Sequence, residues 1–397
     1  MKRTPYAARR VYTRILAMAF VVALLCGYPA VSLAEAAEEI PPAQSALENC
    51  MAAVLIETSS GQVLKESDAD VLHDVAGLTK LPGLLVICEA VERGLLNAEA
   101  DITVSEKAAK TGGPTAFVET GETIKAAPLL KAAIMISAGD AIVALGEHIY
   151  GTEAAFVDAI NTRLKALGID IQLSDAVGSG TQFDAASLAR VGAATAELES
   201  FKIYSTLMLD GITHADGRKT ELANPNRMVR NYAGCDGVMT GSSPADGYAG
   251  VFSVSRGDMR LVAVVIGSKK SAERFAAAKT MLDEAFASMR AQKLSTRGEV
   301  LYEGVKVKGG NSKTVNLIAR DTIVLLLDKA EPSLMAERDI PGVLTAPIGP
   351  DEVVGSIVYK TDTGEVRGRV ELVVDAEITA YALKDIISSI LKNFIRI

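Results

Sequence analysis

Lys80 is the residue of this chain whose type and surroundings first suggest chemistry. It stands at the start of the apolar run Leu81-Pro-Gly-Leu-Leu-Val-Ile-Cys88. Apolar residues recur here at spacings of three and four, which predicts a helix with one buried face. That face consists of Leu84, Leu85, Cys88, Val91 and Leu95. A lysine in the first turns of a helix gains nothing from the helix dipole, so we expect Lys80 to line a functional pocket.

The phrase Ala76-Gly-Leu-Thr-Lys80 resembles the A-S-x-T-K phrase of the low-molecular-mass penicillin-binding proteins, the D-alanyl-D-alanine carboxypeptidases. In that family the serine and the lysine lie three residues apart on one helical face. The lysine takes the serine proton, and the hydroxyl then attacks the peptide carbonyl. Gly77 occupies the serine position here and carries no nucleophile. Thr79 is no substitute, because it is adjacent to Lys80 and faces another side of the helix.

A second phrase, Ser137-Ala-Gly-Asp-Ala141, resembles the family's S-x-N-D-A motif, which lies on a turn between two helices. In the family its serine relays a proton and its asparagine orients the substrate amide. This chain keeps Ser137 but has Gly139 at the asparagine position. The resemblance therefore implies that Lys80 and Ser137 are remnants of a catalytic set, and that Gly139 is a degenerate substrate-binding position.

A third phrase, Asp236-Gly-Val-Met-Thr-Gly241, resembles the family's D-G-x-K-T-G motif on an edge strand. The family's lysine pairs with the terminal carboxylate of the substrate, and the Thr-Gly backbone docks the peptide as an added strand. Met239 stands at the lysine position, so that charge is absent. The resemblance places substrate contacts at Met239, Thr240 and Gly241.

The elements that must position these residues divide the chain into parts. The resemblance implies an α+β fold: a β-lactamase/transpeptidase-like domain, with an antiparallel sheet flanked by helices and a helical insert, followed by a small all-β domain. The sequence pattern itself predicts a hairpin at 51–64, helices near 129–150, 156–168 and 272–289, and short β runs beyond 315. The expected parts are a carboxypeptidase-like domain at 46–290, a linker at 291–298 and a β-rich domain at 299–376.

Residues 1–34 have the pattern of a secretory signal peptide. Five basic residues come first, followed by an apolar core at 15–26 and small residues at Ser32-Leu-Ala34. The basic residues are Lys2, Arg3, Arg9, Arg10 and Arg14. The apolar core is too short to span a bilayer comfortably, although an uncleaved anchor is the alternative. We expect export across the cytoplasmic membrane, with 35–45 as a linker.

Residues 377–397 are predicted to form an amphipathic helix. One side carries a continuous apolar stripe and the other side is polar and mildly basic. The stripe consists of Leu383, Ile386, Ile387, Ile390, Leu391, Phe394 and Ile395. Such a helix suits a membrane interface and would attach the protein to the outer face of the membrane, in the periplasm or cell envelope. The alternatives are docking on the β-rich domain and dimerisation.

Charge and composition exclude several classes of partner. The chain has a net charge of −8, and loss of the basic leader makes the remainder more acidic, which argues against nucleic acid. Of the four cysteines, three remain once the leader is removed: Cys50, Cys88 and Cys235. They have no metal-site spacing, and a Cys50–Cys235 disulfide stays an open alternative. The histidines are scattered and are interpreted as structural: His73, His148 and His214. We expect neither a metal nor a cofactor.

All three motifs have lost a working residue, which separates the predicted function from the predicted fold. In a serine hydrolase, loss of the nucleophile alone costs on the order of a millionfold in turnover. The leading hypothesis is an exported, membrane-associated pseudoenzyme that binds a peptidoglycan stem peptide or a cell-wall synthesis protein. The alternatives are an active serine-type carboxypeptidase that uses another hydroxyl and a structural adaptor. A β-lactamase would need the same missing serine.

Overall fold

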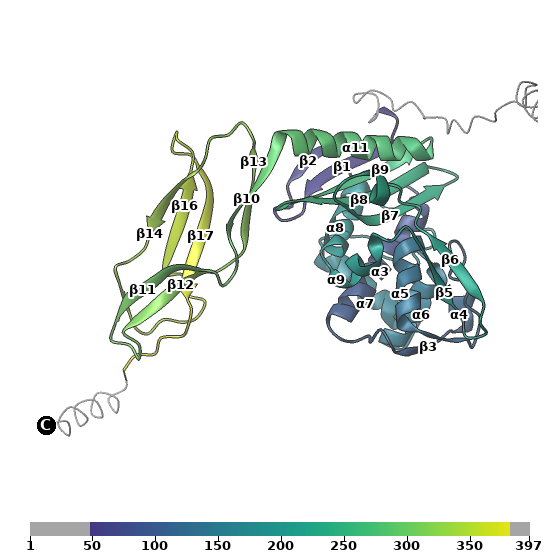
Figure 1. Cartoon of the computed structure of the whole chain (residues 1–397), viewed down its shortest axis with the longest axis horizontal. Helices are drawn as coiled ribbons and strands as arrows, with labels where there is room; N and C mark the ends of the chain where they lie inside the picture. Colours follow the sequence, from purple (N-terminus) through teal and green to yellow (C-terminus); the bar gives the residue numbers. More distant parts are fainter. Residues whose placement is uncertain (1–47, 382–397) are drawn as a thin grey trace, which may run out of the picture. The chain divides into compact units, whose positions relative to one another are not determined.

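The computed structural model describes residues 48–381, so the predicted signal peptide and the linker at 35–45 lie outside the described residues. The first domain is built on a five-stranded antiparallel sheet with the strand order β2-β1-β9-β8-β7 (Figure 1). Its strands are β1 (Ala52–Glu57), β2 (Val63–Ser67), β7 (Cys235–Ser243), β8 (Gly247–Arg256) and β9 (Met259–Ser268). The predicted hairpin at 51–64 is confirmed as β1 and β2.

Helices cover both faces of this sheet (Figure 1). On one face α11 packs against apolar side chains of β8 and β9 such as Phe252 and Leu261. The other face carries the larger core, which α3 to α9 share, whereas Met228 of α10 belongs to the core on the α11 side. The helices of this domain are α3 (Leu81–Glu92), α4 (Glu106–Ala109), α5 (Ala126–Ile136), α6 (Gly139–Tyr150), α7 (Glu153–Ala166), α8 (Ala185–Ala196), α9 (Glu199–Ser205), α10 (Met228–Asn231) and α11 (Ser271–Ser288).

The predicted helices are present, with corrections at their ends. The buried face predicted for the first one holds for Leu84, Leu85 and Cys88 in α3, but Leu95 lies beyond the helix and is 59% exposed. The stretch predicted at 129–150 forms two helices, α5 and α6. They separate where Ser137 adopts a left-handed conformation with φ of 56°.

Two small two-stranded antiparallel sheets complete the first domain and were not predicted. β3 (Asp101–Thr103) pairs with β4 (Thr123–Lys125), and β5 (Leu209–Thr213) pairs with β6 (Lys219–Ala223). Each is short, and neither has the long alternating pattern that identifies a strand from sequence. Their positions matter for the site described below.

The second domain is an all-β sheet of six strands in the order β14-β16-β17-β12-β11-β15, as expected. Its strands are β11 (Val300–Lys308), β12 (Thr314–Ala319), β14 (Met335–Asp339), β15 (Val343–Thr345), β16 (Gly355–Lys360) and β17 (Val366–Val374). The predicted linker at 291–298 is wrong over most of its length. β10 (Met289–Ser295) pairs with the apolar strand β13 (Ile323–Asp328), a partner that its own polar sequence does not reveal.

The predicted C-terminal helix is corrected at its start. Ile378 forms a β-bridge with Ile348 and Ala380 with Gly310, so residues 377–381 are not helical. The rest of that prediction, 382–397, lies outside the described residues. Between 48 and 381 no helix has both the length and the apolar character needed to cross a bilayer.

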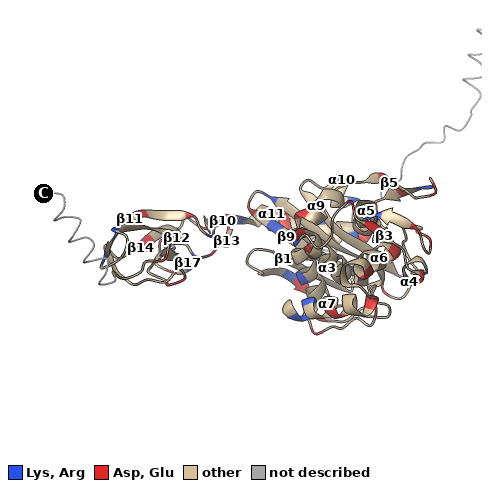
Figure 2. Ribbon diagram, turned by 90° about the horizontal axis from the view of Figure 1, so that it is seen from below, with Lys and Arg blue, Asp and Glu red and all other residues tan. Residues whose placement is uncertain are grey.

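Charged residues are interspersed along the described ribbon, with lysines and arginines placed among aspartates and glutamates (Figure 2). Cys235 is a buried free thiol, so it is not joined to Cys50. Burial raises the pKa of the Cys235 thiol to about 12, which keeps it protonated at neutral pH.

Candidate functional site

The first motif lies on a short 3₁₀ helix, η1 (Ala76–Lys80), that leads directly into α3. A 3₁₀ helix has three residues per turn, so Gly77 and Lys80 lie one above the other on the same side. The turn is held from outside, because the backbone N–H of Ala76 donates to the Asp74 carboxylate at 3.0 Å. The structure thus brings together the position of the missing nucleophile and the lysine.

Lys80 is buried, with 5% of its surface exposed. Its ammonium donates a hydrogen bond to the main-chain carbonyl of Ser137 at 3.1 Å. Burial lowers the pKa of Lys80, and the nearby negative charge of Asp140 partly opposes this shift. The first and second motifs therefore meet at a desolvated amine, as a proton-accepting lysine would require.

The hydroxyl groups around Lys80 do not replace the missing serine. The Thr79 hydroxyl lies 2.9 Å from the carbonyl oxygen of Ala76 and 2.6 Å from that of Val177, so it is directed at backbone acceptors. Ser137 meets the lysine through its carbonyl, not through its hydroxyl. The Thr111 hydroxyl donates to the carbonyl of Lys107 at 3.0 Å.

The two glycines at lost motif positions have different surroundings. A β-carbon added to Gly77 would have its nearest neighbours at 3.9 Å, in Gly241 and Thr240, so a side chain fits there. A β-carbon added to Gly139 would lie 2.8 Å from Cγ2 of Thr111 and 3.3 Å from the Gly112 carbonyl. The segment 111–114 therefore occupies the space that the family's asparagine would need.

The third motif lies on β7, which is an edge strand of the five-stranded sheet. A β-carbon on Gly241 would lie 2.9 Å from the Val75 carbonyl, so only glycine allows β7 to pass this close to the first motif. Thr240 is 9% exposed. Met239 is 3% exposed and belongs to the larger apolar core, whereas the family's lysine would present a charge there.

Arg274 on α11 also belongs to this site and was missed in the sequence. Its Nη1 donates to the carbonyls of Gly241 at 2.8 Å and Ala249 at 3.1 Å, which supports β7 from the side of α11. Burial lowers its pKa to about 10. The only sequence clue was an arginine among small apolar residues of a predicted helix.

Asp140 anchors the segment that packs against Gly139. It is 1% exposed, and its carboxylate accepts hydrogen bonds from the backbone N–H groups of Ala116 at 2.8 Å and Val118 at 3.3 Å. A further bond runs from the Gly139 N–H to the Pro114 carbonyl at 2.8 Å. The start of α6 and the segment 114–118 are therefore held together.

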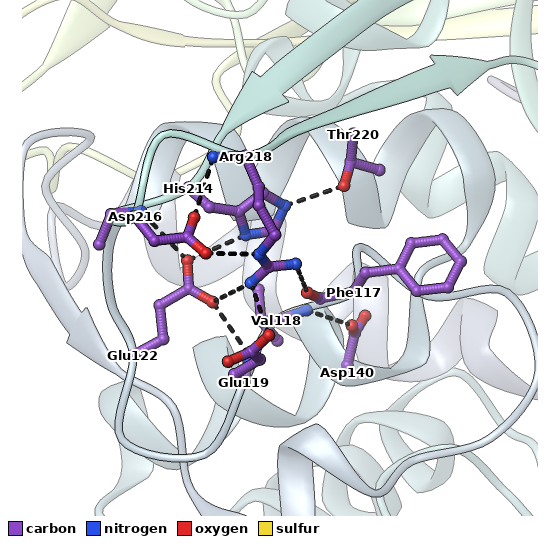
Figure 3. A network of polar contacts seen from close by, with 10 residues as sticks. Phe117, Val118, Glu119, Glu122, Asp140, His214, Asp216, Arg218 and Thr220 are labelled. Atoms are coloured by element: carbon purple, nitrogen blue, oxygen red, sulfur yellow. Dashed lines mark hydrogen bonds and ion pairs between the residues drawn. The ribbon is translucent and has the colours of Figure 1, made fainter.

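The β5–β6 hairpin holds the same segment from its other side (Figure 3). His214 at the hairpin turn is buried between the Glu122 carboxylate at 2.9 Å and the Thr220 hydroxyl at 2.8 Å. Arg218 donates to the Phe117 carbonyl at 3.2 Å and pairs with the Glu119 carboxylate at 3.1 Å. His214 is structural, as expected, but its partners come from a hairpin that was not predicted.

Within residues 48–381 no three His, Cys, Asp or Glu side chains are arranged to hold a metal ion. At this site the buried Lys80 faces Gly77, which carries no nucleophile. The neighbouring edge strand β7 has Met239 where the family has a lysine.

Comparisons with known proteins agree with the motifs. A family description, D-alanyl-D-alanine carboxypeptidase, matches residues 40–270, and a second, penicillin-binding protein 5, C-terminal domain, matches 290–380. D-alanyl-D-alanine carboxypeptidase DacF of Bacillus subtilis is 32% identical over 320 residues, 79% of this chain and 82% of that protein. DacC of Escherichia coli is 27% identical over 337 residues, 81% of this chain and 82% of that protein.

The fold is similar to that of solved penicillin-binding proteins. The structure of penicillin binding protein 5 from Haemophilus influenzae matches with a TM-score of 0.69 and 24% identity, over 83% of this chain and 98% of that one. The first family description covers more than half of the chain, and all three motif positions occur in order within it. This chain therefore belongs to the D-alanyl-D-alanine carboxypeptidase family of low-molecular-mass penicillin-binding proteins.

Proposed function

We propose that this protein is a non-catalytic member of the carboxypeptidase family that binds peptidoglycan stem peptides in the cell envelope. It keeps the fold of an enzyme for peptides that end in D-Ala-D-Ala, and it lacks the groups that would cleave them. By their names, its relatives are carboxypeptidases for D-alanyl-D-alanine.

One observation carries this proposal. The desolvated amine of Lys80 faces Gly77, which has no hydroxyl, and its hydrogen bond goes to the Ser137 carbonyl instead. The nearby Thr79 hydroxyl is directed at backbone carbonyls. A serine-type reaction needs a hydroxyl within hydrogen-bond reach of its base, and this arrangement supplies none.

Peptide binding is supported by the edge position of β7. It pairs with β8 on one side, and no other strand among the described residues pairs with its outer edge. Free N–H and C=O groups on such an edge can accept an extended peptide as an additional strand. Gly241 and Arg274 keep this strand close to the first motif, so the bound peptide would run past Gly77.

Location follows from the two ends of the chain, which lie outside the described residues. We propose that the basic and apolar pattern of residues 1–34 directs export across the cytoplasmic membrane. The apolar stripe beyond residue 382 would then hold the protein on the outer face of that membrane. This places the β7 edge where wall peptides occur.

The test combines labelling with binding. The purified chain is incubated with a fluorescent penicillin and examined by gel and intact mass, and a peptide ending in D-Ala-D-Ala is titrated by calorimetry beside its L-Ala-L-Ala counterpart. We expect no adduct and stereospecific peptide binding. The Gly77→Ser variant is the positive control for labelling, because a side chain fits at that position.

Each alternative has its own outcome. An adduct on the unaltered protein would overturn the non-catalytic assignment, and mapping the modified residue would identify the nucleophile. If Gly77→Ser is labelled but the peptide does not bind, the fold is intact and the ligand is not a stem peptide. A cell-wall synthesis protein would then be the partner to test.

A further inference from the structure

Phe117 combines a strained backbone with an exposed aromatic ring. Its φ is +60°, a left-handed conformation that a phenylalanine adopts only at an energetic cost. Its side chain is 65% exposed, whereas Ala116 and Val118 on either side are buried. This conformation is unfavourable in two ways, because it strains the backbone and exposes an apolar phenyl ring to water.

Two separate segments maintain this conformation. The buried carboxylate of Asp140 accepts hydrogen bonds from the N–H groups of Ala116 and Val118, directly before and after the ring. Arg218 on the β5–β6 hairpin donates to the carbonyl of Phe117 itself. Figure 3 shows the ring directed away from this network, with its backbone held between Asp140 and Arg218. These hydrogen bonds fix the backbone on both sides of Phe117, so the exposure of the ring is part of the folded structure and does not result from loop motion.

The ring lies at the rim of the proposed peptide site. Pro114, three residues earlier, accepts a hydrogen bond from Gly139, and a β-carbon on Gly113 would lie 3.3 Å from the Lys80 amine. Three residues of chain span at most about 10 Å. Phe117 is therefore within reach of a ligand that occupies the site and extends beyond its peptide portion.

The surroundings of the ring indicate the chemistry of that ligand. Phe117 is the only large apolar side chain between residues 96 and 202 of the described chain that is highly exposed, so the segment that carries it presents a single ring to solvent. The exposed polar groups nearby in the network are Glu119, Asp216 and Arg218. Their carboxylates outnumber the guanidinium, which disfavours an anionic ligand and suits a neutral, hydroxyl-rich one.

A sugar ring meets these requirements. One face of a pyranose presents C–H groups with a partial positive charge, and the face of an aromatic ring is negative. The hydroxyl and amide groups at the sugar's edge can bond to carboxylates and guanidinium groups. Resting on the proposed function, we infer that Phe117 stacks against an N-acetylated amino sugar of the same wall fragment whose stem peptide occupies the site.

The test compares three ligands by calorimetry on the full chain. They are the D-Ala-D-Ala stem peptide, the same peptide with its N-acetylated disaccharide, and an N-acetylated amino-sugar oligomer without peptide. We expect the disaccharide to tighten binding, and Phe117→Ala to weaken binding of the disaccharide-peptide by about three- to tenfold while leaving the peptide alone unchanged. Phe117→Tyr, which keeps the ring, should bind as the unaltered protein does.

Two further variants secure the result. Phe117→Gly removes the ring and relieves the backbone strain, so it reports on the ring if Phe117→Ala folds poorly. Leu209→Ala removes another exposed apolar side chain, 79% exposed on β5, and should have no effect. Unchanged binding of the disaccharide-peptide by Phe117→Ala and Phe117→Gly would overturn the inference. An equal loss for peptide and disaccharide-peptide would also overturn it, because the ring would then contact the peptide.

The outcomes separate this inference from the proposed function. Phe117-dependent binding of the sugar oligomer, with no binding of the peptide, would reject the stem-peptide proposal and retain the sugar contact. Peptide binding without any effect of the sugar or of Phe117 would retain the stem-peptide proposal and reject the sugar contact. Failure of all three ligands to bind the unaltered protein would reject both.

Discussion

At the scale of single residues, Lys80 is the best-preserved part of the ancestral chemistry. A buried amine with a lowered pKa is what the family uses to accept a serine proton, and here it donates to a carbonyl. Retention of such a group without its nucleophile has a cost, because burial of a cation opposes folding. The protonation of Lys80 should therefore contribute to the pH dependence of the free energy of unfolding.

The first prediction concerns this pH dependence. At a pH between the lowered pKa of Lys80 and its ordinary value of 10.5, Lys80 is mostly protonated in the unfolded chain and mostly neutral in the folded chain. The unfolded chain therefore binds more protons, and the contribution of Lys80 to the free energy of unfolding rises with pH. Lys80→Met keeps the length and removes the charge. Over that range the free energy of unfolding of the variant minus that of the unaltered protein should fall as the pH rises, by at most about 1.4 kcal/mol per pH unit. Urea unfolding measures it, and a constant difference would contradict the expected pKa.

Gly139 shows that the divergence of the motifs involves more than three independent losses. Thr111 and the Gly112 carbonyl now lie where the family's asparagine would stand. The motif substitution and the position of the segment 111–114 are therefore coupled. Restoring the family residue alone would create a steric conflict.

The second prediction tests this coupling. Gly139→Asn should destabilise the protein by about 1–3 kcal/mol through overpacking. Thr111→Ser removes the conflicting methyl group and keeps the hydroxyl that donates to Lys107. Added to Gly139→Asn, it should recover about 0.5 kcal/mol or more in a double-mutant cycle measured by urea unfolding. Strict additivity of the two changes would show that Thr111 is not the obstacle.

At the scale of elements, the β5–β6 hairpin acts as a clamp on the segment between β3 and β4. The link is a buried pair, because the side chains of His214 and Glu122 are 0% and 6% exposed. Glu122 also accepts a hydrogen bond from the backbone N–H of Ala215 at 3.3 Å. The hairpin is thus attached through one carboxylate that several donors share.

The third prediction follows from that attachment. Glu122→Ala leaves the His214 ring and a backbone N–H without their acceptor, and should cost about 3 kcal/mol of unfolding free energy. Limited proteolysis should then cut within 209–223 sooner than in the unaltered protein. Asp216→Ala, which removes a half-exposed partner of Arg218 from the same turn, is the matched control and should have a much smaller effect. Equal effects of the two variants would argue against a buried clamp.

At the scale of the whole molecule, the chain combines a sheet-and-helix domain, an all-β domain and a final segment with an apolar stripe. The all-β domain carries none of the motif positions. Membrane attachment through the final segment, as proposed, would involve none of the motif positions. This organisation can be tested without any assay of chemistry.

The fourth prediction is a truncation. Removal of residues 382–397 should lower binding to vesicles that contain anionic lipid by about tenfold or more, because the apolar stripe and its basic flank are lost together. Co-sedimentation measures the bound fraction, and circular dichroism checks that the fold is unchanged. Undiminished vesicle binding, or a change from dimer to monomer on truncation, would instead support the alternative that the stripe has a protein partner.

The sequence by itself was sufficient for the family and the fold class. Gly77, Lys80, Ser137, Gly139 and Met239 could be proposed as site positions because short motifs keep their order and local spacing whatever the surrounding fold does. The first hairpin and α11 could be predicted because their apolar periodicity is local. A polar strand such as β10 could not, because its partner β13 lies about thirty residues further on.

Only the tertiary structure decided which distant residues meet. The proximity of Thr111 to Gly139, the support of Gly241 by Arg274 and the hold of Arg218 on Phe117 join segments far apart in the chain. No local pattern encodes these contacts, because they arise when helices and hairpins pack around a common core. The motifs thus identified which catalytic and binding side chains are missing. Packing determined that neighbouring residues fill the space at Gly139, whereas the space at Gly77 remains open.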